Sequence, residues 1–204
     1  MRKLLWSSPK TIDKLDKTLR NGSVILAEGD TVFGLLADVS EKGHARLDYI
    51  KNRSNKPYLI LVHDIKKALN FIEKETIHNI QIEKIIKTCW PGPVTLLFPA
   101  KKSISSYAKS SNETVALRIP NHKGLLQLLS RRDGLFSTSA NKSGESIPHS
   151  LEDVDKDIIN NITSVVINDD HHHGTNLPST IIDCTQEQLV IVRHGNFDAS
   201  NLIK

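Results

Sequence analysis

A chain of 204 residues with 38% hydrophobic and 25% charged residues has the composition of a globular protein with one substantial core. Its net charge of +4 is compatible with a phosphate-bearing ligand or nucleic acid, although many proteins that bind neither are as basic. No apolar stretch approaches the roughly 20 residues of a membrane-spanning helix, and residues 1–9 are too short in apolar character for a signal peptide. We therefore expect a cytoplasmic protein that does not bind a membrane.

The spacing of apolar residues predicts helices and strands that alternate irregularly along the chain. Helices are expected over residues 9–20, 44–51, 66–72, 77–87, 125–129 and 151–160. Strands are expected over residues 24–27, 58–62, 94–98, 114–119, 134–137, 165–167, 180–183 and 189–192. Irregular alternation favours a mixed sheet over a purely parallel one. Because no internal repeat, long linker or change in composition interrupts the chain, one domain over residues 1–204 is expected.

The residues that often bind metals or form disulfides do not have the spacing of such sites. Cys89 and Cys184 lack metal or redox spacing, so a reduced and structural role is expected for both. Three consecutive histidines, His171–His173, have no spaced partner ligands, and a solvated loop is the better interpretation. The glycine motifs of P-loop and dinucleotide-binding proteins are missing, so an ATP site would be of another type.

A run of hydroxyl and amide side chains, Ser137–Asn141, follows the apolar segment Gly134–Phe136. Ser and Asn side chains bond to nearby backbone and favour caps and turns, so this run is not a helix interior. A strand that ends in hydroxyls and backbone N–H groups is suited to hold an anion. A plain polar turn is an equally good interpretation of the run taken alone.

Three cations, Lys51, Arg53 and Lys56, cluster at the end of the predicted helix 44–51. Side chains at i and i+2 can converge on one polyphosphate only if the chain leaves helical geometry between them, which the turn at 54–57 permits. Arginine offers a planar fork for phosphate oxygens and lysine a mobile point charge. The alternative is a solvated basic helix end, which the helix dipole favours.

Arg118 lies inside an apolar, strand-like run, on the same face as Ala116 and Pro120. A buried arginine without a partner would be very costly, so its guanidinium should meet a carboxylate or a phosphate. An internal salt bridge and an anionic ligand are equally compatible with this pattern.

The order of these motifs closely resembles the YrdC-like family, which includes the threonylcarbamoyl-AMP synthases. The resemblance runs from about Ser23 to Arg193 and rests on the segments Asp30–Gly34, Lys51–Pro57, Trp90–Pro93, Thr114–Pro120, Phe136–Gly144, Pro178–Asp183 and Val192–Gly195. It implies a mixed α/β (α+β) fold in which a twisted mixed sheet, flanked by helices, surrounds a deep basic cleft. The turn Trp90–Pro93 is expected to be architectural, because proline and glycine fix it and the indole packs.

The resemblance implies an enzyme, a nucleotidyltransferase that joins L-threonine, bicarbonate and ATP into threonylcarbamoyl-AMP and releases pyrophosphate. The product would serve the threonylcarbamoyladenosine modification of tRNA, with Mg²⁺ accompanying ATP and a partner threonylcarbamoyl transferase receiving the product. An alternative is a non-catalytic module of the same fold that binds double-stranded RNA or tRNA. A relative that carbamoylates another acceptor is a third interpretation, although such enzymes usually carry additional domains.

The resemblance also implies roles for the residues that match the family's motifs. Lys51 and Arg53 would be catalytic. The implied ATP-binding residues are Lys51, Arg53, Thr114, Ser139, Asn141 and Arg193. The implied threonine-binding residues are His63, Arg118, Ser137 and Ser179. No residue is expected to bind a metal directly.

Two segments depart from the family pattern. Glu28-Gly29 stands where the family has Pro-Thr, so a hydroxyl implied to touch the amino acid is missing and a charge is added. The neighbouring Asp30 and Thr31 either line the pocket or mark a strand-to-turn boundary. After Arg53, proline is replaced by serine and the next proline comes about one residue early, so a shortened loop is expected, which leaves the direction of Lys56 open.

Overall fold

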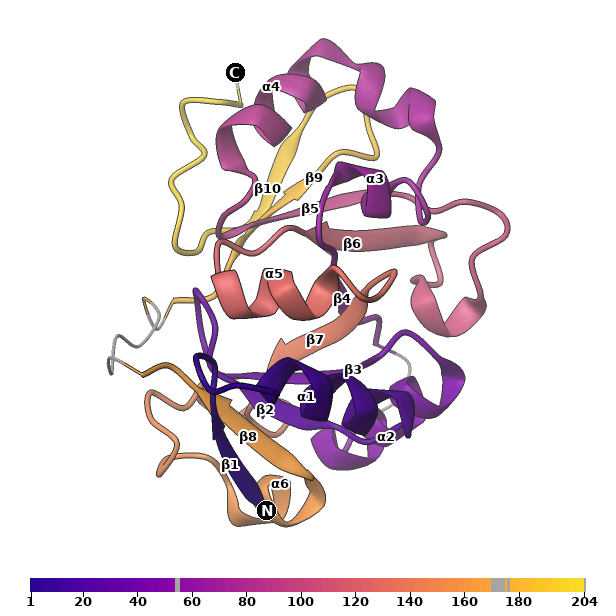
Figure 1. Cartoon of the computed structure of the whole chain (residues 1–204). Coiled ribbons are helices and arrows are strands. Elements are labelled where there is room, and N and C mark those ends of the chain that lie inside the picture. Colours follow the sequence, from indigo (N-terminus) through magenta and orange to yellow (C-terminus); the bar gives the residue numbers. More distant parts are fainter. Residues whose placement is uncertain (54–55, 170–174, 176, 204) are drawn as a thin grey trace.

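The computed structural model describes residues 1–53, 56–169, 175 and 177–203, and one ten-stranded sheet runs through it (Figure 1). The strands are β1 (Arg2–Leu5), β2 (Ile25–Ala27), β3 (Gly34–Asp38), β4 (Leu59–Leu61), β5 (Val94–Pro99), β6 (Thr114–Arg118), β7 (Leu135–Ser139), β8 (Ser164–Ile167), β9 (Thr180–Asp183) and β10 (Val190–Arg193). Their order is β1-β8-β2-β3-β7-β4-β6-β5-β9-β10. The pairs β1–β8, β2–β8, β4–β6 and β5–β9 are parallel and the other five are antiparallel, so the predicted mixed sheet is confirmed.

Capping side chains set where several helices begin. The helices are α1 (Thr11–Arg20), α2 (Glu41–Lys51), α3 (Ile65–Ala68), α4 (Ile80–Cys89), α5 (Lys123–Leu129) and α6 (Lys156–Asn161), with the 3-10 turns η1 (Lys74–His78) and η2 (Ser106–Ala108). Ser40 accepts a bond from the Gly43 amide, so α2 begins earlier than predicted. Asn79 caps α4 and divides the predicted helix 77–87, and Asp155 caps α6, which begins later than predicted.

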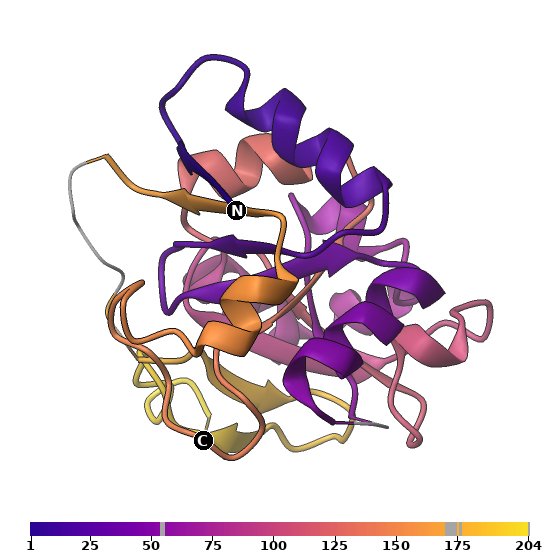
Figure 2. The same ribbon diagram turned by 90° about the horizontal axis from the view of Figure 1, so that it is seen from below.

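Alternation along the strands divides the core into two layers. Ile25 and Leu36 pack with α1 and α5 on one face, whereas their neighbours Leu26 and Leu35 pack with α2 on the other. Figure 2 shows the same division, with α1 and α5 on one side of the strands and α2 and α6 on the other. The sheet is therefore covered on both faces, as the resemblance implied.

Two strands were missed by the sequence analysis. β1 is a short edge strand parallel to β8, and its burial pattern shows a single buried residue, Leu4. β3 is buried on both faces, with Leu35 0% and Leu36 2% exposed, so it carries no alternation of apolar and polar residues. Neither segment has the period-two pattern by which half-buried strands are recognised.

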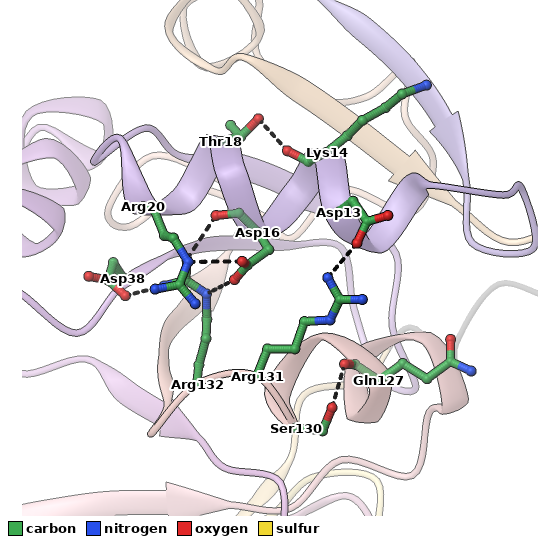
Figure 3. A network of polar contacts seen from close by, with 10 residues as sticks. All are labelled: Asp13, Lys14, Asp16, Thr18, Arg20, Asp38, Gln127, Ser130, Arg131 and Arg132. Atoms are coloured by element: carbon green, nitrogen blue, oxygen red, sulfur yellow. Dashed lines mark hydrogen bonds and ion pairs between the residues drawn. The ribbon is translucent and has the colours of Figure 1, made fainter.

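An ion network joins α1, the end of β3 and the turn after α5 (Figure 3). The Arg132 side chain is 5% exposed, and its Nε lies 2.9 Å from Asp16 Oδ1 while its Nη1 contacts Asp38 Oδ1. Asp16 also pairs with Arg20 at 2.9 Å, and these two arginines hold the pKa of its carboxyl below the usual value against the effect of burial. The network fixes α1 and α5 over the face of the sheet that carries the site described below.

The turn at Trp90–Pro93 and the two cysteines have the structural roles predicted for them. The Trp90 indole donates a 2.7 Å bond to the Val94 carbonyl, and the Gly92 amide donates a 2.8 Å bond to the Ile119 carbonyl. Cys89 and Cys184 are buried free thiols. Burial raises their pKa to about 11 and about 12 respectively, so both stay protonated near neutral pH. His171–His173 lie outside the described residues, and none of the described helices is long and apolar enough to cross a bilayer.

Candidate active site

A cavity of about 400 Å³ opens on the sheet face where Leu125 of α5 packs. Several strands present alternate residues to it, as expected for one face of a pleated sheet, and β7 contributes Thr138 as well. The strand residues that line it at this spacing are Ala27, Gly34, Leu36, Leu59, Leu61, Thr95, Leu97, Ala116, Arg118, Ser137, Ser139, Ile181 and Arg193. The cavity thus gathers segments from residues 27 to 193 on one continuous floor.

Positive charge dominates the cavity. Three arginines line it, Arg53, Arg118 and Arg193, and the described lining residues include no Asp or Glu. Burial lowers the pKa of Arg118, and burial together with the nearby Arg118 lowers that of Arg193. Both guanidinium groups stay charged at neutral pH, because arginine titrates far above it. The cavity is therefore suited to an anionic ligand, while the predicted depth of a basic cleft stays a prediction.

Arg118 is held by the loop between β2 and β3. Its Nη2 lies 3.0 Å from Asp30 Oδ1, and its Nη1 donates a 3.3 Å bond to Thr31 Oγ1. The same carboxylate accepts a 2.8 Å bond from the Asn121 amide, which ties the start of α5 to the loop. The internal salt bridge considered for Arg118 is confirmed, yet its buried Nε has no hydrogen-bond partner among the described residues. Arg118 therefore lines the cavity while it stays paired with Asp30.

The chain leaves helical geometry between Lys51 and Arg53, as predicted from their spacing. Asn52 adopts the left-handed conformation, with φ 48°, and ends α2, so Arg53 departs from the helical path. The guanidinium lies 4.2 Å from the centre of the Tyr58 ring, and its Nε donates a 3.3 Å bond to the Tyr58 hydroxyl. The hydroxyl itself donates to Asp48 at 2.7 Å. Arg53 thus reaches the cavity without a carboxylate partner among the described residues.

Lys51 takes a different direction from Arg53. Its side chain is buried, and its ammonium donates bonds of 2.7 Å to the Ser139 carbonyl and 3.1 Å to Asn141 Oδ1, with a third bond to the Asn141 carbonyl. Burial and the charge of Arg53 lower the pKa of Lys51 to about 8, while Glu145 raises it. The two cations of the predicted pair therefore do not converge on one point of the cavity.

Arg193 at the end of β10 and Ser179 just before β9 also line the cavity. The guanidinium of Arg193 donates bonds of 3.1 and 2.7 Å to the Ser179 carbonyl and one of 3.2 Å to its hydroxyl. The hydroxyl also lies 2.8 Å from Thr95 Oγ1. A Cβ at Gly195 would lie 2.3 Å from the Pro178 carbonyl oxygen, so only glycine permits this close approach of the segment after β10.

The structure brings Arg53, Arg118, Ser137, Ser139, Ser179 and Arg193 of the predicted site residues together on the cavity wall. Lys51 and Asn141 lie beside the wall and contact Ser139. His63 pairs with Asp64 at 2.8 Å and does not line the described cavity. Thr114, also outside the described lining, lies on the face of β6 that carries Arg118, with its hydroxyl 2.7 Å from Ser110 Oγ. The ligand roles implied for all of these residues stay predictions.

The structure shows what Glu28 and Gly29, which replace the Pro-Thr of the family pattern, contact. The Glu28 side chain is buried, its carboxylate accepts a 2.8 Å bond from the Asn168 amide, and its backbone carbonyl accepts a 2.9 Å bond from the Trp6 indole. Gly29 lines the cavity, where a Cβ would lie 3.0 Å from Leu125 Cδ1. Leu125 therefore occupies space beside the glycine, and this part of the wall is apolar.

Three polar residues of the cavity lining are not among the predicted site residues. Thr95 stands within an apolar run, and only the alternation with Leu97 could have placed it on the cavity face. Tyr58 directly precedes β4, and the sequence predicts it as the first residue of a strand but does not predict that its ring contacts Arg53. Thr138 lines the cavity within the hydroxyl run. The expected short loop after Arg53 includes residues outside the described part of the chain, and Lys56, which follows them, is exposed.

Comparison with known proteins identifies the class to which this fold and cavity belong. A family model named Sua5_yciO_yrdC, described as "Telomere recombination", matches residues 17–195. The chain therefore belongs to the Sua5/YciO/YrdC family, as the YrdC-like resemblance of its motifs indicated.

Within the family, the chain is similar to proteins named threonylcarbamoyl-AMP synthase. It is 35% identical to that of Blochmanniella pennsylvanica over 153 residues, which are 74% of this chain and 78% of the relative. It is 30% identical to that of Vibrio vulnificus over 185 residues, which are 88% of this chain and 96% of the relative. The structure of P. abyssi Sua5 complexed with L-threonine matches with a TM-score of 0.84 and 25% identity, over 98% of this chain but only 59% of the longer protein.

Proposed function

We propose that this protein is a threonylcarbamoyl-AMP synthase, which converts L-threonine, bicarbonate and ATP to threonylcarbamoyl-AMP and pyrophosphate. The observation that carries the proposal is a single cavity with three arginines, several hydroxyls and no carboxylate among its described lining residues. Relatives with this name cover most of the chain, and the related Sua5 structure contains L-threonine. In terms of reaction type the enzyme is a nucleotidyltransferase.

The reaction needs a nucleophile from the substrate rather than from the protein. The threonine amine captures CO2, derived from bicarbonate, as a carbamate and releases a proton. A carbamate oxygen then attacks the α-phosphorus of ATP in line, and the bond to the leaving pyrophosphate breaks. Charge accumulates on the phosphates during this step, so fixed cations near them lower the barrier.

The cavity supplies these cations from two separate parts of the chain, the segment after α2 and the end of β10. Arg53 and Arg193 have no carboxylate partner in the described residues, so their charge is available to the phosphates. Arg118, which lines the cavity and stays paired with Asp30, supplies positive charge for the carboxylate of threonine. Holding both substrates on one floor makes the attack effectively intramolecular, which is a large part of the rate enhancement expected here.

Mg²⁺ is proposed to enter with ATP rather than to occupy a site made by the protein. Magnesium prefers carboxylate, phosphate and water oxygens, and the described lining residues of the cavity offer no carboxylate. The described residues also contain no cluster of three or more His, Cys, Asp or Glu that could hold a metal. The ion would be coordinated by the phosphates and water, where it neutralises negative charge. A partner transferase and tRNA would act on the product after its release.

The proposal is tested by measuring pyrophosphate release from ATP with bicarbonate and Mg²⁺, with threonine, with serine and without an amino acid. We expect threonine-dependent release that Arg53→Ala and Arg193→Ala reduce by at least about 100-fold, since each removes transition-state charge stabilisation. Arg131→Ala is the matched control, because Arg131 pairs with Asp13 at the surface, outside the described cavity lining. Absence of release, with strong salt-dependent binding of double-stranded RNA, would contradict the proposal and favour the RNA-binding alternative.

A further inference from the structure

The environment of Lys51 separates it from the other cations of the site. It lies at the last residue of α2, it is 2% exposed, and it does not belong to the described residues that line the cavity. An ammonium group has three N–H donors, and three acceptors surround this one: the carbonyls of Ser139 and Asn141 and the Asn141 side-chain oxygen. Its hydrogen-bonding capacity is therefore filled by the protein.

The turn after β7 is built around this ammonium. Ser139 lines the cavity, and its Oγ donates to the same Asn141 Oδ1 that accepts from Lys51. The other end of that amide donates a 2.6 Å bond to the Glu145 carbonyl, and the Ser143 amide donates a 3.3 Å bond to the Lys51 carbonyl. A short segment with little apolar content is thus tied to the end of α2 at several points.

We propose that Lys51 is a positioning residue, whose ammonium fills an oxygen cage beneath the Ser139–Asn141 turn and fixes the shape that this turn presents to the nucleotide. The proposal rests on the proposed function, because it takes the ligand at this wall to be ATP. Moving the ammonium to a phosphate would remove its bonds to the carbonyls of Ser139 and Asn141 and would leave Asn141 Oδ1 with the bond from the Ser139 hydroxyl. Arg53, two residues further on, is the cation that reaches the ligand.

The division of labour follows from the chain geometry between the two residues. Lys51 is still helical, so its side chain follows the face of α2 that packs under β7. Arg53 comes after the left-handed Asn52, and this turn directs it to the cavity, where it stacks on Tyr58. Lys51 therefore fixes the turn after β7, while Arg53 faces the cavity.

The test compares the unliganded Lys51→Ala and Arg53→Ala proteins by amide hydrogen exchange. If Lys51 positions the turn, the alanine variant loses protection of the Ala140 and Ser143 amides, which donate to the carbonyls of Phe33 and Lys51, by about tenfold or more before any ligand is added. Arg53→Ala should leave these amides unchanged. Equal protection in wild type and Lys51→Ala would overturn the proposal, and this readout does not depend on the identity of the ligand.

Chemical rescue gives the second readout. Truncation of lysine to alanine removes three carbons and the ammonium, which propylammonium matches in size. We expect ATP affinity of Lys51→Ala, measured by calorimetry, to fall about tenfold or more and to recover in propylammonium, with no recovery for Arg53→Ala. If wild type binds ATP but the amine restores neither affinity nor amide protection, the positioning role is refuted. If wild type itself fails to bind ATP, the proposed function fails, while the exchange result still decides the role of Lys51. Lys51→Gln, which keeps a donor without the charge, replaces the alanine variant should that protein not fold.

Discussion

Removal of the Asp30 carboxylate is expected to destabilise the protein substantially. Arg118 is 4% exposed, its Nη2 lies 3.0 Å from Asp30 Oδ1, and the other carboxylate oxygen accepts a 2.8 Å bond from the Asn121 amide. Deleting one partner of a buried ion pair costs about 3–5 kcal/mol, because the remaining charge stays buried without compensation. We expect Asp30→Ala to lower the free energy of unfolding by about 4 kcal/mol, which for a chain of this length lowers Tm by roughly 10 °C.

Urea denaturation and thermal unfolding measure this effect, and two further variants isolate its cause. Asp30→Asn keeps an acceptor for the Asn121 amide but loses the charge, so it should be intermediate. Asp30→Ala combined with Arg118→Met removes both charges and should recover most of the lost stability, since apolar replacement of a buried pair is often neutral. An Asp30→Ala protein as stable as wild type, or a double variant less stable than the single one, would refute the reasoning.

Three further predictions concern other parts of the structure. Arg132→Ala breaks ion pairs with two carboxylates, of which one is 34% exposed, so we expect a loss of about 2 kcal/mol in urea denaturation; an unchanged midpoint would contradict the network's role. Gly29→Ala places a Cβ 3.0 Å from Leu125 Cδ1, so the KM for threonine should rise several-fold while that for ATP stays constant; equal changes in both would exclude a local effect. Burial and Arg53 lower the pKa of Lys51 to about 8, so its ammonium loses a proton as the pH rises through 8. ATP affinity, measured by calorimetry, should therefore fall between pH 7 and 9.5. An affinity that does not change over this range would argue against a required charge on Lys51. The pKa of Lys51 is about 8 in the folded protein and 10.5 for an ordinary lysine. Between these two pH values the unfolded chain binds more protons than the folded one, so this lysine makes the free energy of unfolding rise with pH.

Much of the sheet could be predicted because its strands carry local signals. The apolar runs that became β5, β6 and β9 are bounded by turn residues, and their alternation also places Arg118 on a defined face. β3 could not be predicted in this way, because it is buried on both faces and flanked by irregular segments. Strand order is likewise beyond local pattern, since β2 pairs with β8, more than a hundred residues along the chain.

The candidate site was predictable in its residue types but not in its pairings. The cost of burying Arg118 required a partner, yet nothing local identifies Asp30, which lies 88 residues away in sequence. For Lys51 and Arg53, the i, i+2 spacing required a break in helical geometry but did not say which cation would follow the helix and which would leave it. That distinction depends on the left-handed Asn52 and on acceptors from β7 and the turn after it, which only the folded chain brings near.

Detection of the adduct itself tests the central claim most directly. The purified protein would be incubated with ATP, Mg²⁺, L-threonine and ¹³C-bicarbonate. The products would then be separated and their masses measured by mass spectrometry. The account predicts an adenylate that contains threonine and one ¹³C atom and that forms only when all three substrates are present. Formation of AMP and pyrophosphate without incorporation of ¹³C, or of an adenylate that lacks threonine, would contradict it.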